Sequence, residues 1–576
     1  MRDNMKYILP LIVSLLSVSA CDLNPELELN LTKEDVEHTY SNTMGRATAV
    51  YSFLPDGFSY INGALLDSAS DDAEHTSEGS SVHKFNTGSW SYLNNPDGAW
   101  TRCFKGIYAA NLFLATSDEV ELEHLKYDPD PSVQAQYELY TNNLQRAKYE
   151  VRFLRALFYF ELVQRYGGVP ILEEAYGVDY DFSKIDRDSF EAVIGFIVSE
   201  CEEAADNLPV LYDSDQTGRA TRGAALALKS RALLFAASDL YNDSSWAGGY
   251  GRPELIAMPA GSDRVAQWDA AARAAKAVLD MATDARYTLV GGTNYGNIFL
   301  QSSTSAEVIF ARRYGAGTSF ETANYPIGYD NGNSGTTPSQ NLVDAFEMKT
   351  GAEFSWDGLQ PNSDPYANRD PRLGFDIITN GSTFKSRTVD IFEGGRDGKG
   401  VANATKTGYY LRKYVDPDCD LLLGRGTVHA WIIFRLAEMY LNYAEAMNEA
   451  YGPTGDPNGY GMTARDAVNR IRQRSGVGQP ALGTSLSQEE MRAKIRNERR
   501  VELCFEGHRV FDVRRWMIAE ETLGAPLRGV DIVRNSQSYI YTPMIVESRV
   551  FEPKMYFYPI PQTDLKISGW PQNPLW

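Results

Sequence analysis

Cysteine and histidine are scarce in this 576-residue chain, and neither forms a recognisable site. None of the five cysteines stands in a CxxC or other metal-binding spacing, and the six histidines include no pair at ligand spacing. We therefore predict no metal site. Beyond Cys21 we expect isolated buried thiols, although an oxidising compartment leaves room for one disulfide. The thiols concerned are Cys103, Cys201, Cys419 and Cys504.

Recognisable enzyme motifs and an excess of positive charge are also absent. The chain has no GxSxG elbow, no HExxH zinc motif and no phosphate-binding loop, and nothing in it points to a cofactor. Asp and Glu number 76 against 55 Lys and Arg, so the formal net charge is −21. Such an acidic chain is a poor partner for nucleic acid or for an anionic membrane surface.

Long apolar runs are confined to the N-terminus. Residues 7–20 follow the basic Arg2 and Lys6, and this run suits a secretory signal but is too short and serine-rich for a comfortable membrane span. The small residues Ser19 and Ala20 precede Cys21, the pattern that a lipoprotein signal peptidase requires. We predict a lipoprotein signal peptide over residues 1–20 and a lipid anchor on Cys21. The alternative is an ordinary secretory signal with a chance cysteine.

Most of the clear periodicity is helical. Between residues 144 and 166 apolar residues recur every three or four positions, which predicts a helix with one apolar stripe, and Gly167 and Pro170 predict its end. Small alanines and short Gly-Pro links favour tetratricopeptide-like helix pairs. Further helical segments are 221–241, 268–282, 434–452, 463–476 and 489–517.

A region rich in Gly, Asn, Asp, Ser and Tyr interrupts these helices. It predicts a mostly α fold in which helix pairs support a loop-rich, irregular subdomain with a few short strands. The expected divisions are residues 1–20, a helical part at 21–283, the loop-rich subdomain at 284–430, and a helical part at 431–576 that completes the same fold.

Dense polar motifs have both a structural and a catalytic interpretation. One interpretation of residues 496–515 is catalytic, with an acid, a base and an orienting group drawn from Glu498, Glu502, His508 and Asp512. The four-residue spacing of Arg and Glu instead favours ion pairs along and between helices. The same structural interpretation applies to Arg435, Glu438 and Glu445. The "DPDCD" stretch at 416–420 resembles the start of a calcium loop, but it lacks the later Gly and Glu that such a loop needs.

Ten segments resemble the SusD (RagB/SusD) family of outer-membrane nutrient-binding lipoproteins, in the same order along nearly the whole mature chain. They are W100…Y108…N111, residues 150–172, 218–235, the stretch from Trp268, "PSQNLVDAFEMKTG" at 338–351, "NRDPRL" at 368–373, "GYYLRKY" at 408–414, residues 434–449, 495–516, and "FYPIPQTDL…QNPLW" at the C-terminus.

This resemblance implies a surface-exposed lipoprotein of the outer membrane that is not an enzyme. Its expected role is to capture an oligosaccharide, or a peptide, and pass it to a SusC-like TonB-dependent barrel. Two alternatives are a surface glycanase, which needs a carboxylate pair such as Asp71 and Asp72, and a scaffold of the transporter complex that binds no ligand.

Aromatic and amide side chains in two loops are the candidate ligand contacts, because rings stack on sugar faces while planar polar groups bond the hydroxyls. The first loop contributes Asp71, Asp72, Trp90, Tyr92, Asn94 and Asn95; the second contributes Tyr314, Tyr325, Tyr329, Asp330 and Asn331. We expect Trp90 to face a ligand. In contrast, Trp100 should lie in the core of an amphipathic helix, with Asp97 near its start and Asn111 buried and bonded to backbone.

Overall fold

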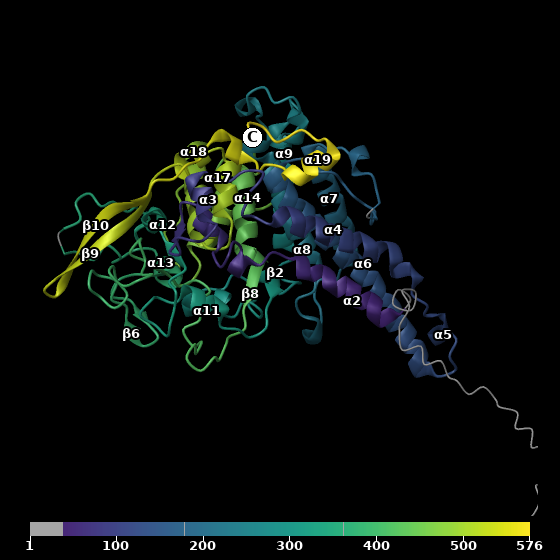
Figure 1. Ribbon diagram of the computed structural model, residues 1–576, viewed down its shortest axis with the longest axis horizontal. Helices are drawn as coiled ribbons and strands as arrows, with labels where there is room; N and C mark the ends of the chain where they lie inside the picture. The colour runs from purple at the N-terminus through teal and green to yellow at the C-terminus, as the bar shows by residue number, and fades with distance from the viewer. Residues whose placement is uncertain (1–38, 178, 361) are drawn as a thin grey trace, which may run out of the picture.

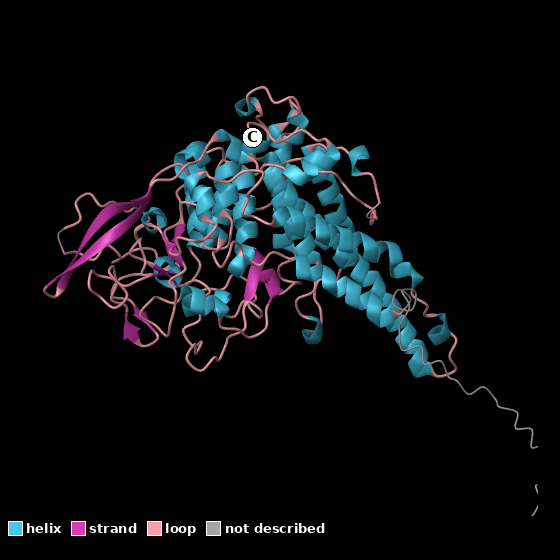
Figure 2. Cartoon of the chain, in the orientation of Figure 1, coloured by secondary structure: helices cyan, strands magenta, loops and turns pink. Residues whose placement is uncertain are grey.

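The computed structural model describes residues 39–177, 179–360 and 362–576. Helices dominate the described chain and the strands are few and short (Figure 2), so the prediction of a mostly α fold is confirmed. None of the described helices is both long and apolar enough to cross a bilayer. The predicted signal peptide and Cys21 lie outside the described residues.

Long helices form a stack in which each packs against the next along the chain (Figure 1). This succession of neighbouring helices is the predicted tetratricopeptide-like arrangement. Helix α14 closes the stack by packing on α9, and it carries α15 and α16. The stack comprises α4 (Ala99–Thr116), α6 (Pro131–Tyr166), α7 (Phe190–Asn207), α8 (Arg222–Ala237), α9 (Arg264–Asp280), α14 (Leu436–Tyr451), α15 (Ala464–Arg472) and α16 (Gln488–Glu502), with α2 (Tyr40–Val50) against α4 and α6.

Helix α6 is buried more completely than its sequence predicts. The expected stripe, which includes Val151, Leu154 and Phe158, is fully buried, and every residue from Phe153 to Tyr166 is buried as well. A helix that is covered on all sides needs no polar face. Its end is as predicted, since Gly167 takes a positive φ of 70° after the last turn.

The remaining α-helices of the described residues are short and link the longer elements. The expected helix at 489–517 is broken after α16, where Phe505 and Gly507 both have positive φ values. The short helices are α3 (His83–Thr87), α5 (Glu123–Lys126), α10 (Asn297–Leu300), α11 (Ser319–Asn324), α12 (Gln340–Ala345), α13 (Arg372–Asp376), α17 (Arg509–Arg515), α18 (Ala519–Thr522) and α19 (Gln562–Ser568).

The described strands form antiparallel pairs, some between distant segments and others within hairpins. Pairing of β1 with β3 links the N-terminal helical part to the loop-rich region, and β9 with β10 forms a hairpin at one end of the molecule (Figure 1). The other pairs are β2–β8, β4–β7 and β5–β6. The expected division of the chain into domains stays a prediction. The strands are β1 (Ala73–His75), β2 (Val308–Arg313), β3 (Thr336–Pro338), β4 (Ile377–Ile378), β5 (Thr383–Phe384), β6 (Arg387–Thr388), β7 (Tyr410–Leu411), β8 (Ala430–Arg435), β9 (Leu527–Asn535) and β10 (Ser538–Glu547).

Candidate ligand-binding surfaces

Trp90 is a core residue, and the expectation that its ring faces outward is wrong. Only 2% of it is exposed. Its ring centroid lies 4.8 Å from that of Phe85, 4.9 Å from that of Tyr558 and 4.8 Å from that of Trp576. Two of these partners come from the C-terminal segment, which no local sequence pattern relates to Trp90. The indole therefore holds the end of the chain against the N-terminal part.

Asp71 and Asp72 are also buried, and both serve as ion-pair partners. Asp71 accepts hydrogen bonds from Arg500 and from Arg509, the latter at 2.8 and 2.9 Å, while Arg500 Nε donates to Asp72 Oδ1 at 2.7 Å. Burial by itself would raise the pKa of Asp71, but the two guanidinium groups hold it below its usual range. These carboxylates join the N-terminal segment to α16 and α17, and the expectation that they meet ligand at a surface is wrong.

The tyrosines of the second loop hold that loop together. The Tyr325 ring is buried, and its hydroxyl donates to the carbonyls of Asp416 and Cys419 at 2.5 and 3.0 Å. Tyr329 is 5% exposed, with the guanidinium of Arg387 at 3.6 Å from the ring centroid. The expectation that these two rings are open to a ligand is wrong, because the loop folds over them.

Tyr314 is half-buried, and its hydroxyl donates to Asp56 Oδ1 at 2.9 Å. Its ring packs edge-on against Phe58 with centroids 5.4 Å apart. Asp330 forms an ion pair with Lys385 at 2.9 Å, and both Asp330 and Asn331 take positive φ. Together these contacts leave the second loop with little free aromatic surface.

The loop of residues 89–95, which we call the Tyr92 loop, keeps its predicted exposure at Tyr92 and Asn94 but not at Trp90. Tyr92 is 39% exposed, Asn94 is exposed and Asn95 is half-buried. Asn94 fixes the loop, since its amide nitrogen donates to the Ser89 carbonyl at 3.1 Å and its oxygen accepts from the Ser91 hydroxyl at 3.0 Å. Buried Trp90 anchors the same loop, so the Tyr92 ring stands on a rigid base.

The predicted start of α4 is confirmed. Asp97 Oδ1 accepts from the Ala99 amide at 2.9 Å, and Asp97 Oδ2 pairs with buried Arg165 at 2.8 Å. Trp100 is 6% exposed, in the core as expected. The Asn111 amide donates to the carbonyls of Leu172 and Glu174 at 2.7 and 3.1 Å, the backbone satisfaction that the sequence predicts.

A second accessible aromatic surface escaped the sequence analysis. It is a cavity of about 610 Å³ between α4, residues 170–185 and the region of α19, and we call it the aromatic pocket. Tyr108 and Ile567 on its rim are 47% and 62% exposed, while the Trp570 indole is fixed by donating to the Ile185 carbonyl at 2.6 Å. Its walls lie far apart in the chain, so only the fold brings them together. The aromatic side chains lining it are Phe53, Trp100, Phe104, Tyr108, Tyr176, Phe182 and Trp570.

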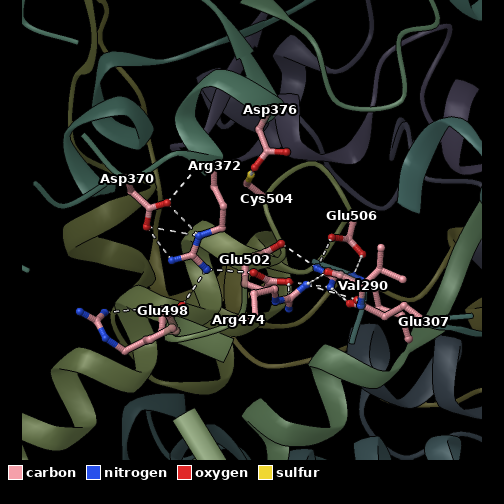
Figure 3. A network of polar contacts seen from close by, with 12 residues as sticks. Val290, Glu307, Asp370, Arg372, Asp376, Arg474, Glu498, Glu502, Cys504 and Glu506 are labelled. Carbon is pink, nitrogen blue, oxygen red and sulfur yellow. Dashed lines mark hydrogen bonds and ion pairs between the residues drawn. The ribbon is translucent and has the colours of Figure 1, made fainter. Parts of the chain in front are cut away.

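The residues of the 496–515 motif form a buried ion-pair network, as predicted (Figure 3). Glu502 lies at its centre and accepts from Arg372 at 2.9 Å, Arg435 at 2.8 Å and Arg474 at 2.6 Å. Burial opposes ionisation of Glu502, but these cations hold its pKa below the usual range. The structural interpretation also holds elsewhere in the motifs: Arg435 pairs with Glu307, Glu502 and Glu506, Glu438 with Arg231, Glu445 with Arg515, and Asp512 with Arg499 and Arg515.

Glu445 makes the ion pairs around Arg515 sensitive to acid. It is 3% exposed; burial raises its pKa, but Arg515 outweighs burial, so its pKa falls from 4.5 to about 2. A depressed carboxyl pKa stabilises the folded state above pH 4.5, and this contribution, of order 3 kcal/mol, is lost as pH falls toward 2. We expect Glu445→Gln to be less stable than wild type at pH 7, with the difference shrinking between pH 5 and 3. Urea unfolding across this range measures it, and a constant difference would contradict it.

Cys103, Cys201, Cys419 and Cys504 are all free and buried, as expected for isolated thiols. No disulfide joins them. The "DPDCD" stretch forms a closed turn instead of an open ligand loop, since Asp420 and Arg425 exchange backbone hydrogen bonds of 3.0 and 2.9 Å. Asp416 Oδ1 accepts from the Asp418 amide at 2.9 Å and Asp420 Oδ1 accepts from the Leu423 amide at 3.0 Å, so one oxygen of each carboxylate is used locally.

Two family models together match most of the chain. Residues 298–576 match the model described as the SusD family, and residues 30–234 match one described as "Starch-binding associating with outer membrane". A SusD-like protein of Formosa agariphila is 23% identical over 492 residues, covering 81% of this chain and 76% of its own.

Two solved structures from Bacteroides fragilis share the fold. A SusD-like protein is 28% identical, with a TM-score of 0.76 over 95% of this chain and 99% of its own. A SusD-like carbohydrate binding protein is 24% identical, with a TM-score of 0.73 over 92% and 99% of the two chains. The protein is thus a helical-repeat protein, in which stacked helix pairs carry a loop-rich part, and this architecture is shared by both solved structures. The chain belongs to the SusD family, which confirms the resemblance carried by its ten segments.

Proposed function

We propose that this protein binds an oligosaccharide at the cell surface and passes it to a TonB-dependent outer-membrane barrel of the SusC type. The observation that carries the binding step is the Tyr92 loop, where an exposed ring lies on a fixed base beside Asn94 and Asn95. A tyrosine ring stacks on the C–H face of a sugar, and neighbouring amides bond its hydroxyl rim.

The family comparisons support a carbohydrate as the ligand. One matching family model carries a starch-binding description with association to the outer membrane, and a structural neighbour is named a carbohydrate binding protein. A lipid anchor on Cys21, if added as the N-terminal sequence predicts, would hold the protein at that membrane. The hand-off to a barrel rests on the family resemblance.

Replacing Tyr92 with alanine is expected to weaken glycan binding by about tenfold or more, a change of about 1.4 kcal/mol or more. The thermal unfolding midpoint should change little, because the ring is already 39% exposed. Isothermal titration against a panel of polysaccharides and oligosaccharides measures the affinity. Tyr127→Ala is the matched control, since Tyr127 is 72% exposed and lies in a different part of the chain.

A parallel variant separates the two aromatic surfaces. If Tyr92→Ala binds like wild type while Tyr108→Ala does not, the aromatic pocket is the binding site and the Tyr92 loop is not. If the wild-type protein binds no member of the panel, the proposed function fails. In that case co-purification with a barrel would favour the scaffold interpretation.

The glycanase alternative loses the carboxylate pair on which it was based. Asp71 and Asp72 are engaged by Arg500 and Arg509 inside the protein, and are not open to a scissile bond. A glycosidase requires two carboxyl groups flanking the substrate. Turnover of a bound glycan by the purified protein would nevertheless restore this alternative and overturn a purely binding role.

A further inference from the structure

Three potential metal ligands from separate segments meet beside the β1–β3 pair. Glu74 comes from β1, His83 is the first residue of α3, and Glu547 is the last residue of β10. One potential ligand atom from each lies within 4.8 Å of the other two. Among the described residues, this is the one group of three or more His, Cys, Asp or Glu side chains close enough together to hold a metal ion.

Glu74 carries a buried charge that its protein neighbours compensate incompletely. The residue is 1% exposed, and its Oε2 atom has no hydrogen-bond partner among the described residues. Lys406 Nζ lies 3.6 Å from Oε1, and also 3.3 Å from Glu78. A buried carboxylate with a free oxygen is costly, and a bound cation would offset that cost.

One nitrogen of the His83 imidazole is held by a backbone carbonyl. Its Nε2 atom lies 2.9 Å from the Ser77 carbonyl oxygen, which can only accept a hydrogen bond. In the neutral ring Nε2 therefore carries the hydrogen, and Nδ1 keeps its lone pair. Metal-bound histidines commonly donate their other ring nitrogen to a backbone carbonyl in this way.

The Glu547 carboxylate is also held by a neighbouring group, the Arg549 guanidinium. Arg549 Nε donates to Glu547 Oε1 at 2.7 Å, which fixes the carboxylate and leaves Oε2 available. Arg549 is itself held by the Ala73 carbonyl at 2.8 Å, next to Glu74 in β1. The chain thus positions both carboxylates independently of any ion.

We propose that Glu74, His83 and Glu547 form a binding site for a divalent first-row transition-metal ion such as Zn²⁺. Two carboxylates and one imidazole suit such an ion, whereas Ca²⁺ and Mg²⁺ favour sites built wholly of oxygen ligands. The ion ties β1 and α3 to the end of the β9–β10 hairpin. The proposal departs from the sequence-based prediction of no metal site, because one histidine with two distant glutamates leaves no spacing signal in the sequence.

Titration of the EDTA-stripped mature protein with zinc chloride tests the site. Wild type is expected to bind one Zn²⁺ per chain and to gain thermal stability on binding, since an ion bound only by the folded state stabilises it. His83→Ala and Glu547→Gln should each weaken binding by at least about tenfold and abolish the zinc-dependent rise in the unfolding midpoint. Calorimetry and thermal unfolding give the two readouts.

Two controls keep the result interpretable. His124→Ala removes an exposed histidine on α5 and should bind zinc like wild type. Circular dichroism of each variant establishes that the fold is retained. Equal zinc affinity in wild type and His83→Ala would overturn the proposal, as would binding of Ca²⁺ in preference to Zn²⁺. Glycan binding is measured separately, so failure of this site leaves the proposed function standing.

Discussion

Replacing Arg435 with methionine is expected to lower the free energy of unfolding by about 3–5 kcal/mol. Arg435 is 1% exposed and pairs with Glu307, Glu502 and Glu506 at 2.7 to 2.8 Å. Methionine fills much of the same volume but removes one cation from three buried carboxylates, which then share only Arg372, Arg474 and Lys413. The cost is the penalty of those buried charges, which exceeds the lost attraction itself. Urea unfolding of wild type and variant at pH 7 gives the difference.

A surface pair provides the matched control. Arg396 pairs with Asp390 at 3.0 Å, but its side chain is 63% exposed, so Arg396→Met should change stability by less than about 1 kcal/mol. Similar losses in the two variants would mean that burial does not decide the effect. The buried ion pairs of Arg435 would then contribute no more to stability than a surface pair.

Trp90→Ala is the second change with a large expected effect, again a loss of about 3–5 kcal/mol in unfolding free energy. The indole is 2% exposed and packs on rings from α3 and from the C-terminal segment. Its removal leaves a cavity where the C-terminal segment packs against α3 and the loop that follows it. Chemical denaturation measures the loss, and limited proteolysis should show earlier cleavage near the C-terminus.

Tyr92→Ala, two residues away, is the internal comparison. It should retain wild-type stability while losing glycan affinity, whereas Trp90→Ala should lose stability. If Trp90→Ala is as stable as wild type and only binds glycan less well, then the ring is available to ligand and its buried position is not maintained in solution.

Helices and buried charge pairs were accessible to sequence reasoning because their signals are local. Four-residue spacing of Arg and Glu around Glu498 and Glu502 predicted ion pairs, and the structure contains them. The partners were not predictable, since Arg372, Arg435 and Arg474 come from other segments. The completeness of burial around α6 was missed for the same reason: covering helices leave no mark on its own periodicity.

Exposure in loops was the least predictable property. Trp90 and Tyr92 have the same local composition around them, yet one is buried and the other is 39% exposed. No helical or strand period separates them, and the burial of Trp90 depends on Tyr558 and Trp576. The aromatic pocket, the Asp71–Arg509 pair and the Glu74–His83–Glu547 group were invisible in the sequence because each joins distant segments.

By itself, the sequence determined the family, the mostly α architecture and the structural role of the Arg–Glu motifs, because motif order and helical periodicity are properties of consecutive residues. Tertiary structure alone decided which aromatic rings reach solvent and which carboxylates have cations beside them. These are properties of what packs over a residue, and here the covering segments lie hundreds of positions away, as Asp71 and Arg509 do.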